Sequence, residues 1–297
     1  MALRPRRSLA ALLVLLVVAA CSEEESPAPT TPTTATSLWE STSPNRSATT
    51  TLPDSPTTTA DVTEPIDADV VVPDGDGPFP AVVLVHGGGW VAGAPRLMAP
   101  LARHLSENGF LTVNTSYTLA SRDRPGYPAA VEDVACAVRF AALHPDSDGT
   151  VAVIGHSAGA HIGALVAVVG DRYRGDCPFG GPGLPDLFVG LAGPYDVTRL
   201  GIAVAGFFGG PPDRLPEVWE AGNPINFAAE NSELDTLIMY GELDGIVVDG
   251  FAIDFHNALV DAGVDSLLEQ IPGARHSDVH NPTLVGDLIV TWLERER

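Results

Sequence analysis

The chain contains no lysine, and its basic residues are 16 arginines set against 38 aspartates and glutamates, for a formal net charge of −22. Phosphate backbones repel such a surface, so the balance argues against a nucleic-acid partner. A phosphate-binding loop that ends in Gly-Lys-Ser/Thr is also excluded, because its lysine is absent. The negative charge by itself identifies no substrate, since it is typical of a soluble acidic surface.

The amino-terminal region has no apolar run of the ~20 residues that a membrane-spanning helix needs. Three arginines precede a shorter apolar stretch at residues 8–20, which predicts an export signal. The following VAAC, residues 18–21, resembles a bacterial lipobox, which implies cleavage before Cys21 and a lipid on its thiol. An ordinary secretory signal with an incidental cysteine is the alternative. The pair Arg6-Arg7 weakly resembles a twin-arginine signal, so the export route stays open between the two systems.

Large apolar residues are scarce between residues 22 and 62, where threonine, proline and serine dominate. Such a segment cannot bury enough surface to offset chain entropy. The predicted organisation is therefore a signal peptide at residues 1–20, a disordered tether at 21–62 and one catalytic domain at 63–297.

Cysteine is also scarce, with three residues in the whole chain. If Cys21 carries a lipid, Cys136 and Cys177 remain as an even pair in an oxidising compartment, where a disulfide is favoured. Two unpaired thiols are the alternative.

Apolar runs of strand length alternate with stretches of helical periodicity, which predicts an α/β fold with a mostly parallel sheet and helices on both faces. Ligands in such folds bind beyond the carboxyl ends of the strands. The Gly- and Pro-rich stretch at residues 197–227 is expected to be irregular and to form a short cap. The expected strands are 67–73, 80–90, 110–117, 150–155, 186–196, 234–244 and 265–276, and the expected helices are 95–109, 128–144, 158–170, 250–263 and 282–297.

Ser157 lies in GHSAG, between the strand 150–155 and the helix 158–170. Gly155 and Gly159 lack a Cβ, so strand and helix can approach closely and turn a sharp corner at the serine. This geometry exposes the hydroxyl above the sheet edge and favours a nucleophile. A plain strand–turn–helix with a chance Gly-x-Ser-x-Gly pattern is the alternative.

The strand 80–90 ends in the sequence His86-Gly-Gly-Gly-Trp90. Consecutive glycines allow backbone N–H groups to face a ligand, as an oxyanion requires. Gly88 and Gly89 are the expected donors, and a flexible turn is the alternative.

Asp244 follows a predicted strand by a short turn, and His276 lies in the loop after the last strand. Both can reach the same rim as Ser157, where a histidine suits a general base and a buried carboxylate can orient it. Glu242 and His280 are the competing residues. His276 and His280 have the spacing of a zinc helix, but the sequence lacks the glutamate of His-Glu-x-x-His, so no metal is expected.

The order Ser157, Asp244, His276 is that of the α/β-hydrolase triad. Together with HGGGW, GHSAGAH, GELDGIVV and GARHSD, it resembles the esterase/lipase branch of that fold, with the hormone-sensitive-lipase-like and feruloyl-esterase-like carboxylesterases nearest. The resemblance covers residues 65–297. It implies Ser157 as nucleophile, His276 as general base and acid, and Asp244 as its orienter. The oxyanion donors implied are the N–H groups of Gly88, Gly89 and Ala158, with Trp90 lining the acyl or alcohol pocket and with His86 and His156 in structural roles.

The predicted function is a serine carboxylesterase that acts on short acyl esters at the cell surface of a bacterium, needs no cofactor and is held to the membrane by a lipid on Cys21. The short segment before the first strand leaves little room for a cap there, which argues against long-chain lipids. An arylformamidase-like amide hydrolase, which GHSAGAH also resembles, and a non-catalytic binding module are the alternatives. The sequence gives neither the natural ester nor the oligomeric state.

Overall fold

The structure is a computed structural model that describes residues 66–296. The predicted signal, Cys21, the tether and the predicted domain start at residue 63 lie outside the described residues. Among the described helices, none has the length and hydropathy needed to cross a bilayer.

A single sheet of seven strands forms the centre of the described fold, in the order β1-β3-β2-β4-β5-β6-β7. All neighbouring strands are parallel except β1, which pairs with β3 in the antiparallel direction. The strands are β1 (Ala68–Val71), β2 (Phe79–Val85), β3 (Leu111–Thr115), β4 (Ser147–His156), β5 (Leu187–Leu191), β6 (Asp235–Gly241) and β7 (Asp265–Ile271). The predicted mostly parallel α/β sheet is therefore confirmed.

The central strands are buried on both faces, and alternate side chains enter two separate apolar cores. In β2, Val83 and Val85 belong to one core, whereas Val82 and Leu84 belong to the other. Side chains of a strand point to opposite faces with a period of two, so a strand covered on both sides must be apolar throughout. This explains the unbroken valine and leucine run in the sequence.

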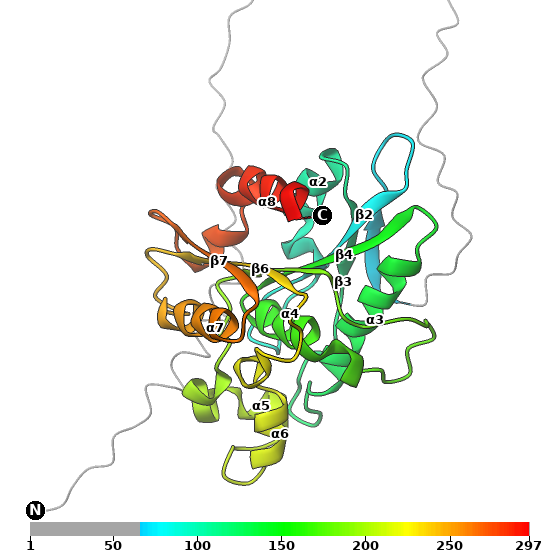
Figure 1. Ribbon diagram of the computed structural model, residues 1–297. Coiled ribbons are helices and arrows are strands. Elements are labelled where there is room, and N and C mark those ends of the chain that lie inside the picture. Colours follow the sequence, from blue (N-terminus) through cyan, green and yellow to red (C-terminus); the bar gives the residue numbers. More distant parts are fainter. Residues whose placement is uncertain (1–65, 297) are drawn as a thin grey trace, which may run out of the picture. The chain divides into compact units, whose positions relative to one another are not determined.

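Helices cover both faces of the sheet (Figure 1). The helices α2 (Ala99–Glu107) and α8 (Pro282–Glu296) share one core, and α3 (Ala129–Leu143), α4 (Ala158–Val169) and α7 (Gly250–Asp261) share the other. The remaining 3-10 segments outside the cap are η1 (Pro95–Leu97), η2 (Gly170–Arg172) and η5 (His276–His280).

The strand order reverses between β2 and β4, which lie side by side at the centre of the sheet. From β2 the chain proceeds to β3 on one side, and from β4 it proceeds to β5 on the other. Open α/β sheets bind ligands at such a switch point, outside the carboxyl ends of the strands. The glycine-rich loop after β2 and the serine after β4 both lie there.

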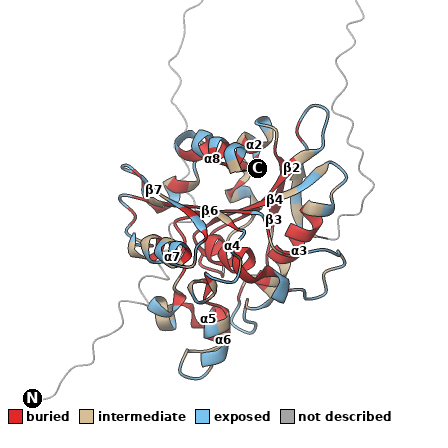
Figure 2. Ribbon diagram, in the orientation of Figure 1, coloured by how far each residue is buried: buried red, intermediate tan, exposed pale blue. Residues whose placement is uncertain are grey.

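Helix α4 is buried along its whole length, from Ala158 to Val169 (Figure 2). Apart from His161 its sequence is apolar on every side, so a second layer must cover the face turned away from the sheet. The segment between β5 and β6 contributes to that layer through four short helical pieces: η3 (Val197–Val204), α5 (Ala205–Phe208), α6 (Pro216–Ala221) and η4 (Pro224–Phe227). We refer to residues 197–227 as the cap. The cap is more helical than the sequence predicts, because glycines and prolines divide it into pieces too short to show a period.

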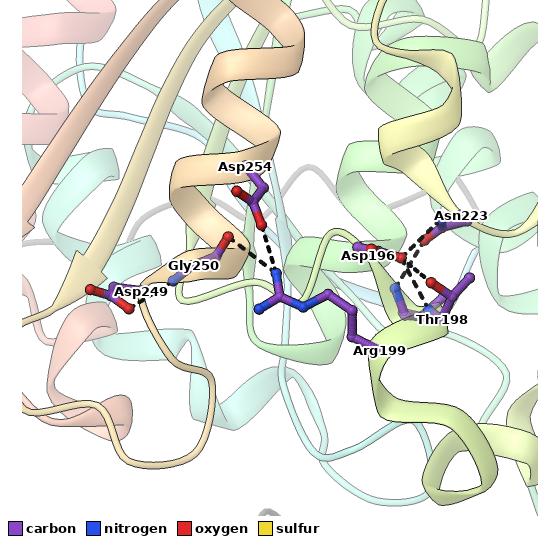
Figure 3. A network of polar contacts seen from close by, with 8 residues as sticks. Asp196, Thr198, Arg199, Asn223, Asp249, Gly250 and Asp254 are labelled. Atoms are coloured by element: carbon purple, nitrogen blue, oxygen red, sulfur yellow. Dashed lines mark hydrogen bonds and ion pairs between the residues drawn. The ribbon is translucent and has the colours of Figure 1, made fainter.

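Polar contacts attach the beginning of the cap to α7 (Figure 3). Arg199 donates to the carboxylate of Asp254 at 2.8 Å and to the carbonyl of Gly250 at 3.3 Å. Its guanidinium also lies 4.3 Å from the ring centroid of Phe251. Nearby, Asp196 accepts from Asn223 at 3.2 Å, so the two ends of the cap are joined to each other.

The loop that follows α4 is tied to α3 in two ways. Cys136 and Cys177 form a disulfide with Cα atoms 5.5 Å apart, which confirms the predicted pairing. One turn further along α3, the buried Arg139 donates to the carbonyls of Tyr173 at 3.0 Å and Gly181 at 3.3 Å. No short motif in the sequence marks Arg139 for this role.

Candidate active site

Ser157 occupies the corner between β4 and α4 with a backbone φ of 55° and ψ of −119°. A positive φ is strained for a residue with a side chain. Neighbouring glycines allow the corner to form: a Cβ on Gly155 would meet the carbonyl of Gly159, and a Cβ on Gly159 would meet the carbonyl of Val85. The predicted sharp corner is therefore present, and the absence of two side chains makes it possible.

Ser157, His276 and Asp244 form one hydrogen-bonded chain. The Oγ of Ser157 lies 2.8 Å from Nε2 of His276, and Nδ1 of the same ring lies 2.7 Å from Oδ2 of Asp244. The side chains of His276 and Asp244 are 3% and 1% exposed, so solvent does not compete for these bonds. The structure brings together the three residues that the sequence nominated.

The carboxylate fixes which nitrogen of His276 carries the proton. An ionised carboxylate only accepts, so Nδ1 of His276 must be the donor toward Asp244. In the neutral ring, Nε2 is then an acceptor and receives the Ser157 hydroxyl proton. This tautomer is the one that a base acting on the serine requires.

The second oxygen of Asp244 is held by the main chain that follows it. Its Oδ1 accepts from the N–H groups of Ile246 at 2.8 Å and Val247 at 2.9 Å. The competing Glu242 points elsewhere and accepts from the N–H of Gly273 at 2.8 Å. The local turn therefore presents Asp244, and not Glu242, to the histidine.

The glycine-rich loop after β2 has the backbone form that an anion-binding turn needs. Gly88, Gly89 and Trp90 have φ values of 132°, 60° and 64°. A Cβ on Gly88 would meet the carbonyl oxygen of Ala92, so this position requires glycine. Among residues 66–296, neither the Gly88 nor the Gly89 N–H has a hydrogen-bond acceptor. Ala158 begins α4, where an N–H lacks an intrahelical acceptor.

Trp90 is 5% exposed and packs in an aromatic cluster. Its ring centroid lies 5.7 Å from that of Phe207 in the cap, and its Nε1 donates to Nδ1 of His161 at 3.1 Å. These contacts establish a packing role. Contact of Trp90 with an acyl or alcohol group stays a prediction.

His161 is a site residue that was not predicted from the sequence. Since Trp90 can only donate, Nδ1 of His161 accepts, and Nε2 donates to the carbonyl of Gly222 at 2.8 Å. Burial lowers the pKa of His161 to about 4, so the ring is neutral near pH 7. One imidazole thus joins the glycine-rich loop, α4 and the cap. Its position four residues after Ser157 was the only signal in the sequence.

The other predicted structural histidines also hold loops. His86 donates from Nδ1 to the carbonyl of Gly87 at 2.8 Å, and Tyr117 donates to the carbonyl of His86 at 3.0 Å. The Nε2 of His156 donates to the main-chain carbonyl of His276 at 3.0 Å. The competing His280 lies with its ring centroid 4.3 Å from that of His156, and the partner of the Ser157 hydroxyl is His276.

A cavity of about 540 Å³ lies beside the disulfide, between the end of β3 and α3. None of Ser157, Asp244 and His276 lines it, so it is separate from the hydrogen-bonded chain. No group of three His, Cys, Asp or Glu side chains within residues 66–296 could hold a metal ion.

With this geometry in view, similarity to known proteins identifies the family. The BD-FAE family model matches residues 68–259, which is more than half of the chain. The chain belongs to the BD-FAE family. The α/β-hydrolase fold and the esterase resemblance inferred from the motifs are thereby confirmed, and the match spans Ser157 and Asp244 but ends before His276.

The chain is also similar to a mycobacterial esterase in sequence and to two solved structures in fold. Esterase LipC of Mycobacterium tuberculosis is 29% identical over 218 residues, covering 67% of this chain and 53% of LipC. The acetyl ester-xyloside bifunctional hydrolase of Caldicellulosiruptor lactoaceticus has a TM-score of 0.65 at 21% identity, over 80% of this chain and 91% of that one. The butyrate-bound esterase Est2 of Thermogutta terrifontis has a TM-score of 0.60 at 20% identity, over 77% and 87%. The chain spans about half the length of LipC, and the structural likenesses establish the fold.

Proposed function

We propose that this chain is a serine carboxylic-ester hydrolase that forms an acyl-enzyme intermediate. The observation that carries the proposal is the hydrogen-bonded chain from Ser157 through His276 to Asp244, which starts at a strained corner residue. A binding module would have no need for a serine at positive φ that donates to a buried, tautomer-fixed imidazole.

In the first half of the reaction, Oγ of Ser157 attacks the ester carbonyl carbon while Nε2 of His276 takes the hydroxyl proton. The carbonyl oxygen becomes an oxyanion that accepts from the N–H groups of Gly88, Gly89 and Ala158. The C–O bond to the leaving alcohol then breaks, and His276 gives its proton to that alcohol. Asp244 stabilises the imidazolium that exists between these two transfers.

In the second half, a water molecule attacks the acyl-serine. His276 takes a proton from the water, and the tetrahedral intermediate collapses with cleavage of the bond between the acyl carbon and Oγ. The proton returns to Ser157, and the carboxylic acid leaves. No redox partner or cofactor enters this balance.

Short acyl chains are the proposed substrates. The butyrate bound to the Thermogutta esterase, which has the same fold, is consistent with a small acyl group. The proposed site of action is the cell surface, with a lipid on Cys21 as the anchor, and this part rests on the leader and lipobox in the sequence.

The test is hydrolysis of p-nitrophenyl acetate and butyrate by the folded domain and its Ser157→Ala variant. Loss of the nucleophile is expected to lower kcat by about 10⁶-fold. Ser147→Ala is the matched control, because Ser147 begins the strand that ends just before Ser157 and its hydroxyl accepts from the exposed N–H of Gly149. Undiminished turnover by Ser157→Ala would refute the assignment.

Two comparisons separate the proposed function from its alternatives. A fluorophosphonate probe labels an activated serine and would leave a binding module unlabelled at Ser157. Faster hydrolysis of N-formylkynurenine than of butyrate esters would instead assign a formamide hydrolase.

A further inference from the structure

His156, the residue immediately before the serine, makes a direct contact with the loop that carries the base. Its Nε2 lies 3.0 Å from the main-chain carbonyl oxygen of His276. A carbonyl can only accept, so Nε2 of His156 carries a proton and donates it. The two residues are 120 positions apart, and the contact therefore depends on the tertiary fold.

The ring of His156 is held on several sides. It is 3% exposed, and its centroid lies 5.0 Å from that of His276 and 4.3 Å from that of His280. Its other nitrogen, Nδ1, faces Gly87, where an added Cβ would lie 2.8 Å away. Burial, followed by the neighbouring rings of His280, His276 and His86, holds the pKa of His156 well below its ordinary value. The ring is neutral and single-tautomer at pH 7, as a fixed donor must be.

Asp244 and His156 restrain different parts of the same residue. Asp244 binds the imidazole and fixes its tautomer and rotation, whereas His156 binds the main chain from which the imidazole extends. Ser157 is itself fixed by the corner and by its N–H, which donates to the carbonyl of Leu191 at 2.9 Å. His156 and Ser157 are adjacent at the end of β4, and between them they position the main chain of His276 and the serine hydroxyl.

We propose that His156 is a positioning residue, which sets the distance between Ser157 Oγ and His276 Nε2 by anchoring the main chain of His276. The proposal rests on the proposed esterase function. It adds that the residue before the serine acts through a specific N–H donor and not through bulk or packing alone.

Two amide substitutions at His156 distinguish a role as hydrogen-bond donor from a role in packing alone. In glutamine the side-chain nitrogen is the same number of bonds from Cα as Nε2 of histidine, so His156→Gln keeps a donor at His276. In asparagine the nitrogen corresponds to Nδ1, so His156→Asn directs its amide toward Gly87 and leaves the carbonyl of His276 without its partner. Both variants are neutral at every pH of interest.

The experiment measures kcat and KM of the folded domain on p-nitrophenyl butyrate for the parent, His156→Gln and His156→Asn. A misplaced base typically costs about 10²-fold in rate, and this loss is expected in kcat of His156→Asn with KM changed less than twofold. His156→Gln is expected to recover kcat to within about fivefold of the parent, since it restores the bond. The rate of fluorophosphonate labelling should follow the same order, because it also requires an activated Ser157.

His256→Gln is the matched control, since His256 is partly buried and its Nδ1 makes a hydrogen bond to Ser266 at 2.9 Å, between α7 and β7, which an amide at the Nε2 position does not replace. It should lose stability without losing kcat. Equal losses in the Gln and Asn variants, unchanged kcat in His156→Asn, or unfolding of both variants would assign His156 to packing and overturn the proposal. An inactive and unlabelled parent would instead count against the esterase function. In that case the rate of main-chain hydrogen exchange at His276, compared between the parent and the two His156 variants, would still decide whether His156 anchors this segment.

Discussion

The two halves of the candidate site are held in place by different means. The serine half, residues 86–90 and 155–161, is shaped by main-chain conformation, with positive φ at Gly88, Gly89, Trp90 and Ser157. The acid–base half, Asp244 and His276, lies in loops after β6 and β7 and is held by side-chain hydrogen bonds.

The two halves should therefore be sensitive to different kinds of substitution. In the serine half an added methyl group collides with backbone, so the damage comes from shape. In the acid–base half an isosteric change leaves the shape intact and alters only which atom carries a proton. A substitution that adds volume should therefore damage the serine half, whereas an isosteric substitution that moves a proton should damage the acid–base half.

Among the substitutions that compare the two halves, Asp244→Asn should have the largest effect, because it preserves shape and changes proton placement. An amide N–H facing Nδ1 of His276 turns that nitrogen into an acceptor and puts the proton on Nε2, where it blocks acceptance from Ser157. We expect kcat to fall by about 10⁴-fold with little change in melting temperature. Glu242→Gln is the control, and an equal loss in that variant would move the orienting role away from Asp244.

A shape change in the serine half, Gly88→Ala, should have the next largest effect. The new Cβ would meet the carbonyl of Ala92 at a φ of 132°, so the loop must shift and withdraw its N–H donors. Loss of one oxyanion donor typically lowers kcat by about 10²–10³-fold, and we expect that range from steady-state kinetics. Gly109→Ala has a similar positive φ of 86° with open space around it, and it should reduce stability while kcat is retained.

The bridge at His161 should give a smaller effect that depends on which bond is removed. His161→Asn can still accept from Trp90 at the Nδ1 position, whereas His161→Gln can still donate to the carbonyl of Gly222. If the bond from Trp90 to His161 restrains the glycine-rich loop, kcat should fall about tenfold in the Gln variant and less in the Asn variant. The reverse order would connect activity to the cap and not to the loop.

The last prediction concerns the pH dependence of stability that His161 causes, and activity is expected to change least here. The pKa of His161 is about 4 in the fold because of burial, below its ordinary value of 6.5, so between these values the unfolded chain binds more protons. Its contribution to stability is complete above pH 6.5 and declines as pH falls toward 4, by about 3 kcal/mol in total. Urea unfolding at pH 7.0 and 4.5 should show a decline that is shallower in His161→Asn than in the parent. Parallel declines in the two proteins would contradict the assignment.

Features that depend on local sequence pattern could be predicted. Short motifs predict the seven strands, the corner at Ser157 and the chain order of Ser157, Asp244 and His276. The number of cysteines predicts the pair Cys136–Cys177, because one of the three is assigned to the lipid. Contacts between remote side chains could not be predicted in this way. His161 meets partners 71 and 61 positions away, and no short pattern marks Trp90 or Gly222 as its neighbours.

The cap shows a second limit of local pattern. Its pieces are too short and too rich in Gly and Pro to display helical periodicity, so the sequence predicts an irregular segment. What organises residues 197–227 is the fully buried α4 beneath them, together with anchors such as the bond from Arg199 to α7. Those determinants lie outside the segment itself.

The hydroxyl of Ser157 and its base are 119 positions apart, and the base follows the last strand of the sheet. Reactivity at that hydroxyl therefore cannot develop while only the first strands have been made, whatever structure they adopt. A nascent chain would hold an inert serine until β7 and the turn after it had docked. The reactivity proposed for Ser157 is accordingly a late signal, which would report completion of the sheet.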